Sequence, residues 1–243
     1  MKLKVILLSA GFLASQQLFA QDPHFTQFIA APFTVNPAYA GVFNGTARIM
    51  TNYRQQWANL VDPFVTTVVA GDVKIGTINP EYGQHPFNIG VQFMQDNAMA
   101  GAFKSSYAGL MASYHVNLNS EGEQSIGAGL SLNYGNRRID FSSLTFDNQW
   151  RSGGYQSSAP SGEAALQNMK PFYSVGAGLL FKSGNPMSGT FFDLGFSGYH
   201  FNKPIQTVMD DPKQILPIRW SGQVTFQQYI NDVSLINIKG LFQ

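Results

Sequence analysis

The sequence predicts an all-β fold, namely an antiparallel transmembrane β-barrel of an outer membrane. Three observations support this prediction. Several runs of about 10 to 13 residues alternate polar and apolar side chains, close to the ~9–11 residues that a tilted membrane-crossing strand needs and longer than the ~5–6 of a soluble strand. Charged residues make up only 12% of the chain and aromatic residues 14%. After residue 20, no apolar run is long enough for a membrane-spanning helix. A soluble secreted β-sandwich, the alternative, would usually carry more Lys and Glu on its outer face.

The alternation is most informative in residues 45–57. Arg48 and Arg54 fall on one face, and Ile49, Tyr53 and Trp57 fall on the other. Because successive side chains of a strand point to opposite faces, one face would meet water and the other lipid. The same reasoning predicts nine strands, at 45–57, 63–76, 86–96, 104–117, 124–141, 170–182, 189–200, 217–230 and 232–242.

The first 44 residues are predicted to lie outside the barrel wall. Residues 1–20 have the pattern of a signal peptide, with Lys2 and Lys4 before an apolar stretch at 5–13 and a cleavage site before Gln21. Residues 21–44 contain several prolines, which cannot donate to a strand ladder. This periplasmic or luminal segment could fold into the lumen, lie at the mouth of the barrel or form an extended lead-in.

The connections divide into two sets, which supports the barrel. Short turns are predicted at 118–123, at 183–188 and around Asn231 on one side, and long loops at 142–169 and 201–216 on the other. Short periplasmic turns and long outer loops are typical of outer-membrane barrels. Nine strands is an odd number, whereas bacterial single-chain barrels have even numbers. We therefore expect the chain to be a fragment of a larger even-stranded barrel, incomplete at its C-terminus within the barrel region 45–243.

The sequence predicts neither catalysis nor a metal or cofactor site. There is no cysteine, and the four histidines lack metal-ligand spacing. The pair Asp210 and Asp211 supplies too few ligands for calcium, and no Gly-x-Ser-x-Gly elbow of a lipase is present. A net charge of +1 argues against a nucleic-acid partner. The predicted luminal face instead collects charges of both signs, which suits internal ion pairing or a narrow mixed-charge pore: Arg48, Asp72, Lys74, Asp193 and Arg219.

Three motifs in order resemble the N-terminal signature of the PorP/SprF family. They are Gln-Asp-Pro-His-Phe-Thr-Gln-Phe at 21–28, Asn-Pro-Ala-Tyr-Ala-Gly at 36–41 and Tyr-Arg-Gln-Gln-Trp at 53–57. Further similarity runs through Ser113-Tyr-His-Val, Gly127-Ala-Gly-Leu and Gly176-Ala-Gly-Leu. The resemblance implies a barrel without enzymatic activity, in contact with outer-membrane lipid, that belongs to the type IX secretion system.

The resemblance also implies partners, and two sets of residues are candidates for contacting them, one from the family signature and one from the composition of the long outer loop. Members are needed for type IX secretion or for displaying secreted cargo at the cell surface. SprF-like members of gliding bacteria serve adhesins with a type B C-terminal domain, and PorP-like members associate with secretion components that include a periplasmic peptidoglycan-binding protein; the sequence does not decide between the two branches. Signature residues would contact a partner or a plug: Asn36, Pro37, Ala38, Tyr39, Tyr53, Arg54, Gln56 and Trp57. In the long outer loop, Trp150, Arg151 and Tyr155 would contact cargo, because aromatics and arginine often anchor interfaces. A passive outer-membrane porin for small solutes is the alternative function.

Overall fold

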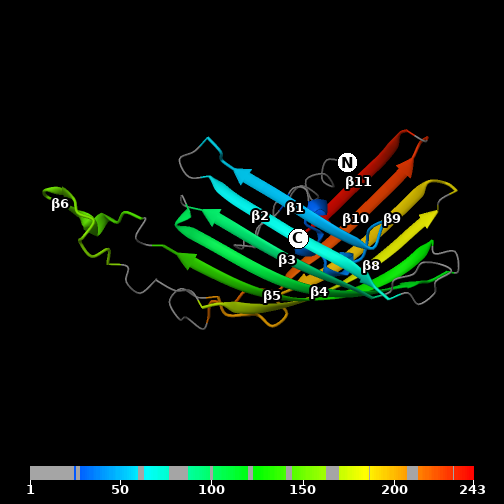
Figure 1. The fold of residues 1–243 in the computed structure, drawn as a ribbon, viewed down its shortest axis with the longest axis horizontal. Coiled ribbons are helices and arrows are strands. Elements are labelled where there is room, and N and C mark those ends of the chain that lie inside the picture. The colour runs from blue at the N-terminus through cyan, green and yellow to red at the C-terminus, as the bar shows by residue number, and fades with distance from the viewer. Residues whose placement is uncertain are drawn as a thin grey trace, which may run out of the picture.

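Nine strands form one antiparallel sheet in the computed structural model, which describes residues 25, 28–59, 63–76, 87–98, 101–119, 123–140, 144–162, 170–185, 187–206, 213–231 and 233–243. The strands are β1 (Ala47–Gln56), β2 (Phe64–Ile75), β3 (Phe87–Ala98), β4 (Phe103–Asn117), β5 (Gln124–Ile139), β8 (Phe172–Asn185), β9 (Thr190–Tyr199), β10 (Arg219–Tyr229) and β11 (Leu235–Phe242). Each pairs with its neighbour in sequence, and β1 and β11 form the two edges. The sheet curls into a half-barrel (Figure 1).

The two faces of the sheet differ in the way that the alternation predicts. Along β1, exposed and half-buried residues alternate through all ten positions. The convex face exposes large apolar side chains, such as Ile49 (82% exposed) and Leu130 (64%). Buried residues of the concave face are often polar, among them Ser113 and Gln223. An apolar outside around a polar inside is the pattern of a membrane barrel, and the predicted all-β fold is confirmed.

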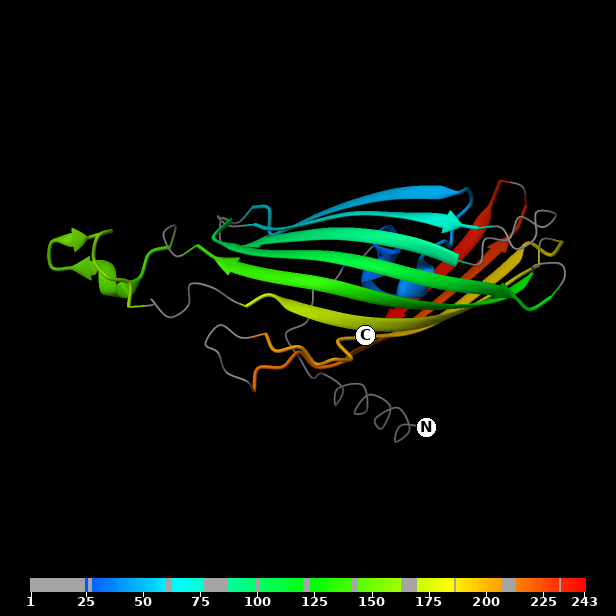
Figure 2. The same cartoon turned by 60° about the horizontal axis from the view of Figure 1, so that its bottom comes forward.

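Residues 28–44, here called the luminal segment, lie against the concave face. The segment contains three short 3-10 turns, η1 (Phe28–Ala30), η2 (Pro32–Thr34) and η3 (Pro37–Tyr39), which lie within the curve of the sheet (Figure 2). The side chain of Phe33 is buried in an apolar cluster with Val68 of β2 and Met111 of β4. The segment therefore shares a core with the inner wall.

The long connection between β5 and β8 contains a small hairpin of its own. After a 3-10 turn, η6 (Asp147–Gln149), strand β6 (Trp150–Arg151) pairs with β7 (Gly154–Tyr155). Residues 144–162, here called the β6–β7 loop, extend beyond the end of the main sheet (Figure 1).

The observed strands differ from the predicted ones mainly at their ends. The turn predicted at 183–188 begins later, because β8 continues to Asn185 and Ser183 still pairs with Gln124 and Phe192. The last strand begins at Leu235 and not at residue 232, because Asn231 accepts hydrogen bonds from the backbone of Val233 and Ser234 in the preceding turn. The predicted signal peptide lies outside the described residues. Within the described residues, no helix is long and apolar enough to cross a membrane.

Candidate functional site

The luminal segment is held by side chains of the inner wall that donate to its backbone carbonyls. Proline-containing 3-10 turns leave many carbonyls without a backbone partner, and buried carbonyls need one. Strands from both halves of the sheet supply the donors: Ser197 to Val35, Tyr199 to Phe33 (2.6 Å), Arg219 to Thr34 (2.7 Å), Ser113 to Ala40 (2.7 Å) and Lys74 to Phe43 (2.6 Å). The segment therefore bridges the sheet from β2 to β10.

Asn36 fixes the centre of the segment. Its side-chain oxygen accepts a hydrogen bond from the backbone N–H of Ala38 (2.8 Å), which caps η3. Its amide nitrogen donates to the carbonyl of Leu179 and to Oε1 of Gln223, each at 3.0 Å. Pro37 follows at the first position of the turn, where its missing N–H costs nothing. The Asn-Pro-Ala-Tyr motif thus defines one capped turn joined to two strands.

Glycines of the inner wall let this turn approach the sheet. A Cβ at Gly129 would lie 2.4 Å from the backbone nitrogen of Ala38. At Gly178, a Cβ would lie 2.0 Å from the side-chain oxygen of Asn36. Both distances are far inside van der Waals contact, so only glycine fits at these positions while η3 is seated.

An ion pair between the partly exposed Arg48 and the buried Asp72 holds the end of the luminal segment that leads into β1. Arg48 binds Asp72 with two hydrogen bonds, Nε to Oδ1 at 2.9 Å and Nη2 to Oδ2 at 2.8 Å. The backbone N–H of Gly41 donates to the same carboxylate (2.8 Å). The Arg48 guanidinium also donates to the carbonyl of Val42 (3.2 Å) and lies 4.7 Å from the ring centroid of Phe43. Bidentate arginine–carboxylate pairs are among the stronger and more directional polar contacts.

The remaining predicted luminal charges lie on the same wall. Lys74 lies 4.7 Å from the Phe43 ring, and Asp193 faces Lys182 across the β8–β9 pair. Burial, and secondarily the negative charge of Asp193, raise the pKa of Tyr39 in η3 to about 12. The Tyr39 phenol therefore stays protonated and neutral in the physiological range.

The signature residues of 53–57 divide between the two faces. Tyr53 lies on the convex face and is 64% exposed, which suits an aromatic residue at a membrane boundary. Trp57 follows the end of β1 at a φ of 56° and is 60% exposed; its ring packs edge-on, at 5.2 Å, against Phe64, which lines the luminal cleft. Arg54 and Gln56 face the lumen, where they line a polar cleft of about 300 Å³.

The cleft continues across five strands as a row of polar side chains. In register order the row is Arg54, Thr66, Asp96, Ser105 and Arg137. Thr66 donates to Asp96 at 2.6 Å, and Arg137 donates to the hydroxyl of Tyr107 through Nε (3.1 Å) and Nη2 (2.9 Å). These contacts organise the wall next to the luminal segment, with charges of both signs.

Trp150, Arg151 and Tyr155 come together in the β6–β7 loop. The two aromatic rings lie 5.6 Å apart, and Trp150 is 63% exposed. Gln149 is buried beneath them and bonds four parts of the loop: it accepts from Phe146 N and Tyr155 Oη and donates to the carbonyls of Ser157 and Ala159. The loop therefore presents a preformed aromatic and cationic surface.

No group of three or more His, Asp or Glu side chains that could hold a metal ion occurs in the described ranges. His115 lies on the inner wall, 3.1 Å from the carbonyl of Ala40, and the His200 ring lies 2.7 Å from the Ser174 hydroxyl. Both histidines thus have structural contacts. His24, His85, Asp210 and Asp211 lie outside the described residues.

Sequence reasoning missed the wall residues that contact the luminal segment most closely. Ser197, Tyr199 and Gln223 were not singled out, although they occupy inward positions of predicted strands. Their position on the polar face was the feature of the sequence that could have identified them as contacts of the luminal segment. Gly129 and Gly178 were identified only as members of the two Gly-Ala-Gly-Leu motifs that carry the family resemblance.

The fold and this site define a β-sheet membrane protein whose concave side is filled by its own N-terminal segment. The chain belongs to the PorP/SprF family, described as type IX secretion system membrane protein, whose family model matches residues 17–239. Comparison with curated proteins and with solved structures gave no match. The chain is therefore a membrane protein of the type IX secretion system.

Proposed function

We propose that this protein is an outer-membrane component of the type IX secretion system that supports secretion or surface attachment of cargo and catalyses no reaction. The cargo class is a secreted surface protein with a type B C-terminal domain, such as a gliding-motility adhesin. Residues 1–20 direct its export. Other secretion components, including a periplasmic peptidoglycan-binding protein, are its partners on the inner side of the membrane.

The observation that carries the proposal is the seated luminal segment. Side chains from β1, β2, β4, β9 and β10 donate to its backbone. A segment tied at so many points favours a closed scaffold over an open pore. In this proposal the luminal segment is a plug. Its contacts with the wall are made by the signature residues Asn36, Pro37, Ala38 and Tyr39, and Arg54 and Gln56 face the lumen beside it.

Cargo contact is assigned to the β6–β7 loop. The loop lies on the side of the long connections, which in outer-membrane barrels is the outer side. Trp150, Arg151 and Tyr155 are residue types that dominate interface energies. Gln149 already binds the Tyr155 hydroxyl, and the Tyr155 ring packs on Trp150, so part of the entropy cost of binding is met before cargo arrives.

The first test measures display of a fusion carrying a type B C-terminal domain on cells that express the variant Trp150→Ala/Tyr155→Ala. We expect normal insertion of the variant and loss of most displayed fusion. The matched control is Met187→Ala/Val233→Ala. It truncates two side chains that are more exposed than Trp150 and Tyr155 and that lie in turns at the opposite end of the sheet. Display by the loop variant equal to wild type would refute the assignment of cargo to the loop.

The passive-porin alternative draws support from the polar cleft of about 300 Å³ beside the plug. Planar-bilayer conductance of the purified full-length protein distinguishes the two functions. A closed scaffold gives no steady conductance. Steady ohmic channels in wild-type protein would favour the porin.

A further inference from the structure

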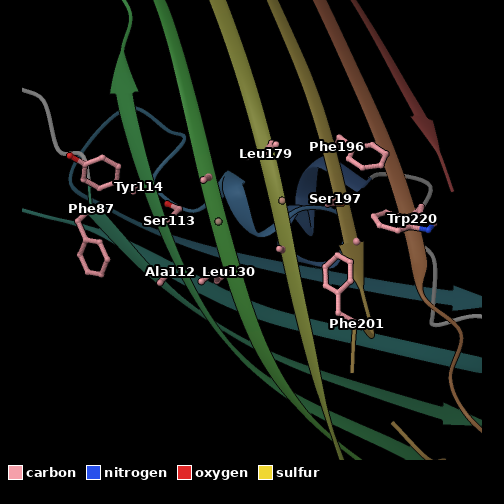
Figure 3. A pocket seen from close by; sticks show the side chains of 15 residues that line it. Phe87, Ala112, Ser113, Tyr114, Leu130, Leu179, Phe196, Ser197, Phe201 and Trp220 are labelled. Carbon is pink, nitrogen blue, oxygen red and sulfur yellow. The ribbon is translucent and has the colours of Figure 1, made fainter. Parts of the chain in front are cut away.

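A groove of about 580 Å³ opens on the convex face of the sheet, across β3, β4, β5, β8, β9 and β10. Small residues form its floor: Ala112, Ala128, Ala177 and Gly198. Leu130 and Leu179 stand along it, and aromatic side chains close its two ends (Figure 3): Phe87 and Tyr114 at one, Phe196, Phe201 and Trp220 at the other. The volume lies in the range of about 300–1,000 Å³ that is usual for ligand sites.

The end at Trp220 is built from ordered ring contacts. Phe196 stacks on Trp220, with ring centroids 5.4 Å apart and an interplanar angle of 16°. Phe201 meets the same indole edge-on at 5.5 Å. A Cβ at Gly198 would lie 2.5 Å from the Phe201 ring and 2.9 Å from Trp220, so glycine is required for both rings to pack there. The groove end is therefore a fixed wall.

The groove lies directly behind the seat of the luminal segment. Ala128 and Ala177 on the outer face are followed in sequence by Gly129 and Gly178, whose inner faces touch η3. Side chains are small on both sides of the wall at this place. The backbone alone separates the plug from the medium around the protein.

We propose that this groove binds one acyl chain of a membrane phospholipid. The groove is continuous with the apolar convex face, and the medium around that face in a membrane protein is lipid hydrocarbon. A helix with its side chains is about 10–12 Å across, so the groove would hold little more than one turn of it, whereas an acyl chain can follow the floor between the aromatic ends. The strands that form the floor are paired on both sides, so they offer no free edge to a partner strand.

The test fills the groove and counts retained lipid. Ala128→Leu/Ala177→Leu places two isobutyl groups on the floor, and Ala108→Leu makes the same exchange on the convex face of β4 outside the groove. Native mass spectrometry of detergent-purified full-length protein, delipidated and supplied with phosphatidylethanolamine, measures binding. We expect a stoichiometry near one for wild type and Ala108→Leu, and an affinity lower by roughly tenfold or more for the filled groove. Equal retention in all three proteins would overturn the site.

A second measurement does not depend on a groove variant. The sequence has three tryptophans, so Trp57→Phe/Trp150→Phe leaves Trp220 as the only one. Dibromostearoyl phosphatidylcholine is titrated into this protein in detergent micelles while Trp220 fluorescence is recorded. Quenching that saturates supports the site. Quenching that rises linearly with the lipid-to-detergent ratio indicates only general lipid contact and contradicts the acyl-chain site. A photocrosslinker placed at residue 177 gives a further check: a copurified polypeptide crosslinked to it would also contradict the site.

Discussion

The luminal segment and the β6–β7 loop both lie outside the main sheet, yet they are ordered by different means. The carbonyls of the luminal segment are bonded by the wall, and its apolar side chains pack on the wall. The β6–β7 loop takes its order from Gln149, whose hydrogen bonds all go to the loop itself. Wall substitutions should therefore loosen the luminal segment and weaken the fold, whereas substitutions within the loop should leave the sheet unchanged.

The largest expected effect comes from Arg48→Met. The side chain of Asp72 has no exposed area, and the variant removes the charge that compensates it. Loss of one partner of a buried ion pair costs about 3–5 kcal/mol. Urea unfolding in detergent micelles should show this loss in the free energy of unfolding.

Two companions sharpen the result for Arg48. Arg138→Met removes an exposed arginine at the end of β5 and should change stability by less than about 0.5 kcal/mol. Arg48→Met/Asp72→Asn removes both charges and should recover much of the loss, because a neutral amide at 72 is far cheaper to bury. If Arg48→Met alone were as stable as wild type, Arg48 would not compensate the buried charge of Asp72.

Asn36→Ala is expected to cost somewhat less, about 2–4 kcal/mol. The variant removes the cap of η3, worth about 0.5–2 kcal/mol, and leaves the buried Oε1 of Gln223 without the donor that it has now, at about 1–3 kcal/mol. Unfolding in urea again provides the measurement. Asn119→Ala is the control, since Asn119 also caps a backbone N–H, that of Gln124, but in an exposed turn.

Gly129→Val comes next. Valine suits a strand, but its Cβ would overlap the backbone of Ala38, so the luminal segment must leave its seat. Overpacking of this kind costs about 1–3 kcal/mol. Limited proteolysis of the inserted protein should cut within residues 28–44 much faster than in wild type. Gly222→Val, where a Cβ meets nothing within 4 Å, should keep the wild-type rate; equal cutting of both variants would argue against the seat.

The sequence could predict which face each strand residue occupies, because alternation depends only on the geometry of a strand. It therefore placed Arg48, Asp72, Lys74 and Arg219 on the inner face. Their partners depend on long-range register and on the curl of the sheet. Asn36 and Gln223, 187 positions apart, illustrate this.

Glycines show the same limit at the level of single residues. Gly127 and Gly129 both occur on the inward register of β5 and look equivalent in the sequence. Only the position of η3 puts Gly129 against the backbone of Ala38, whereas Gly127 lies against the ring of His115. The β6–β7 hairpin was likewise predicted only as a long loop, because Gln149 forms its contacts with backbone carbonyls, which no side-chain pattern reveals.

The smallest effect on the sheet is expected for Gln149→Ala, and it completes the contrast. The free energy of unfolding in urea should stay within about 0.5 kcal/mol of wild type, because no described contact of Gln149 reaches the nine-stranded sheet. Within the loop, the carbonyls of Ser157 and Ala159 lose their donor, and Tyr155 loses its acceptor. In a protein with Trp57→Phe and Trp220→Phe, Trp150 fluorescence should shift to the red and become more accessible to iodide. An unchanged Trp150 signal would mean that the loop is held by something other than Gln149, and a large loss of global stability would mean that the loop and the sheet are one cooperative unit.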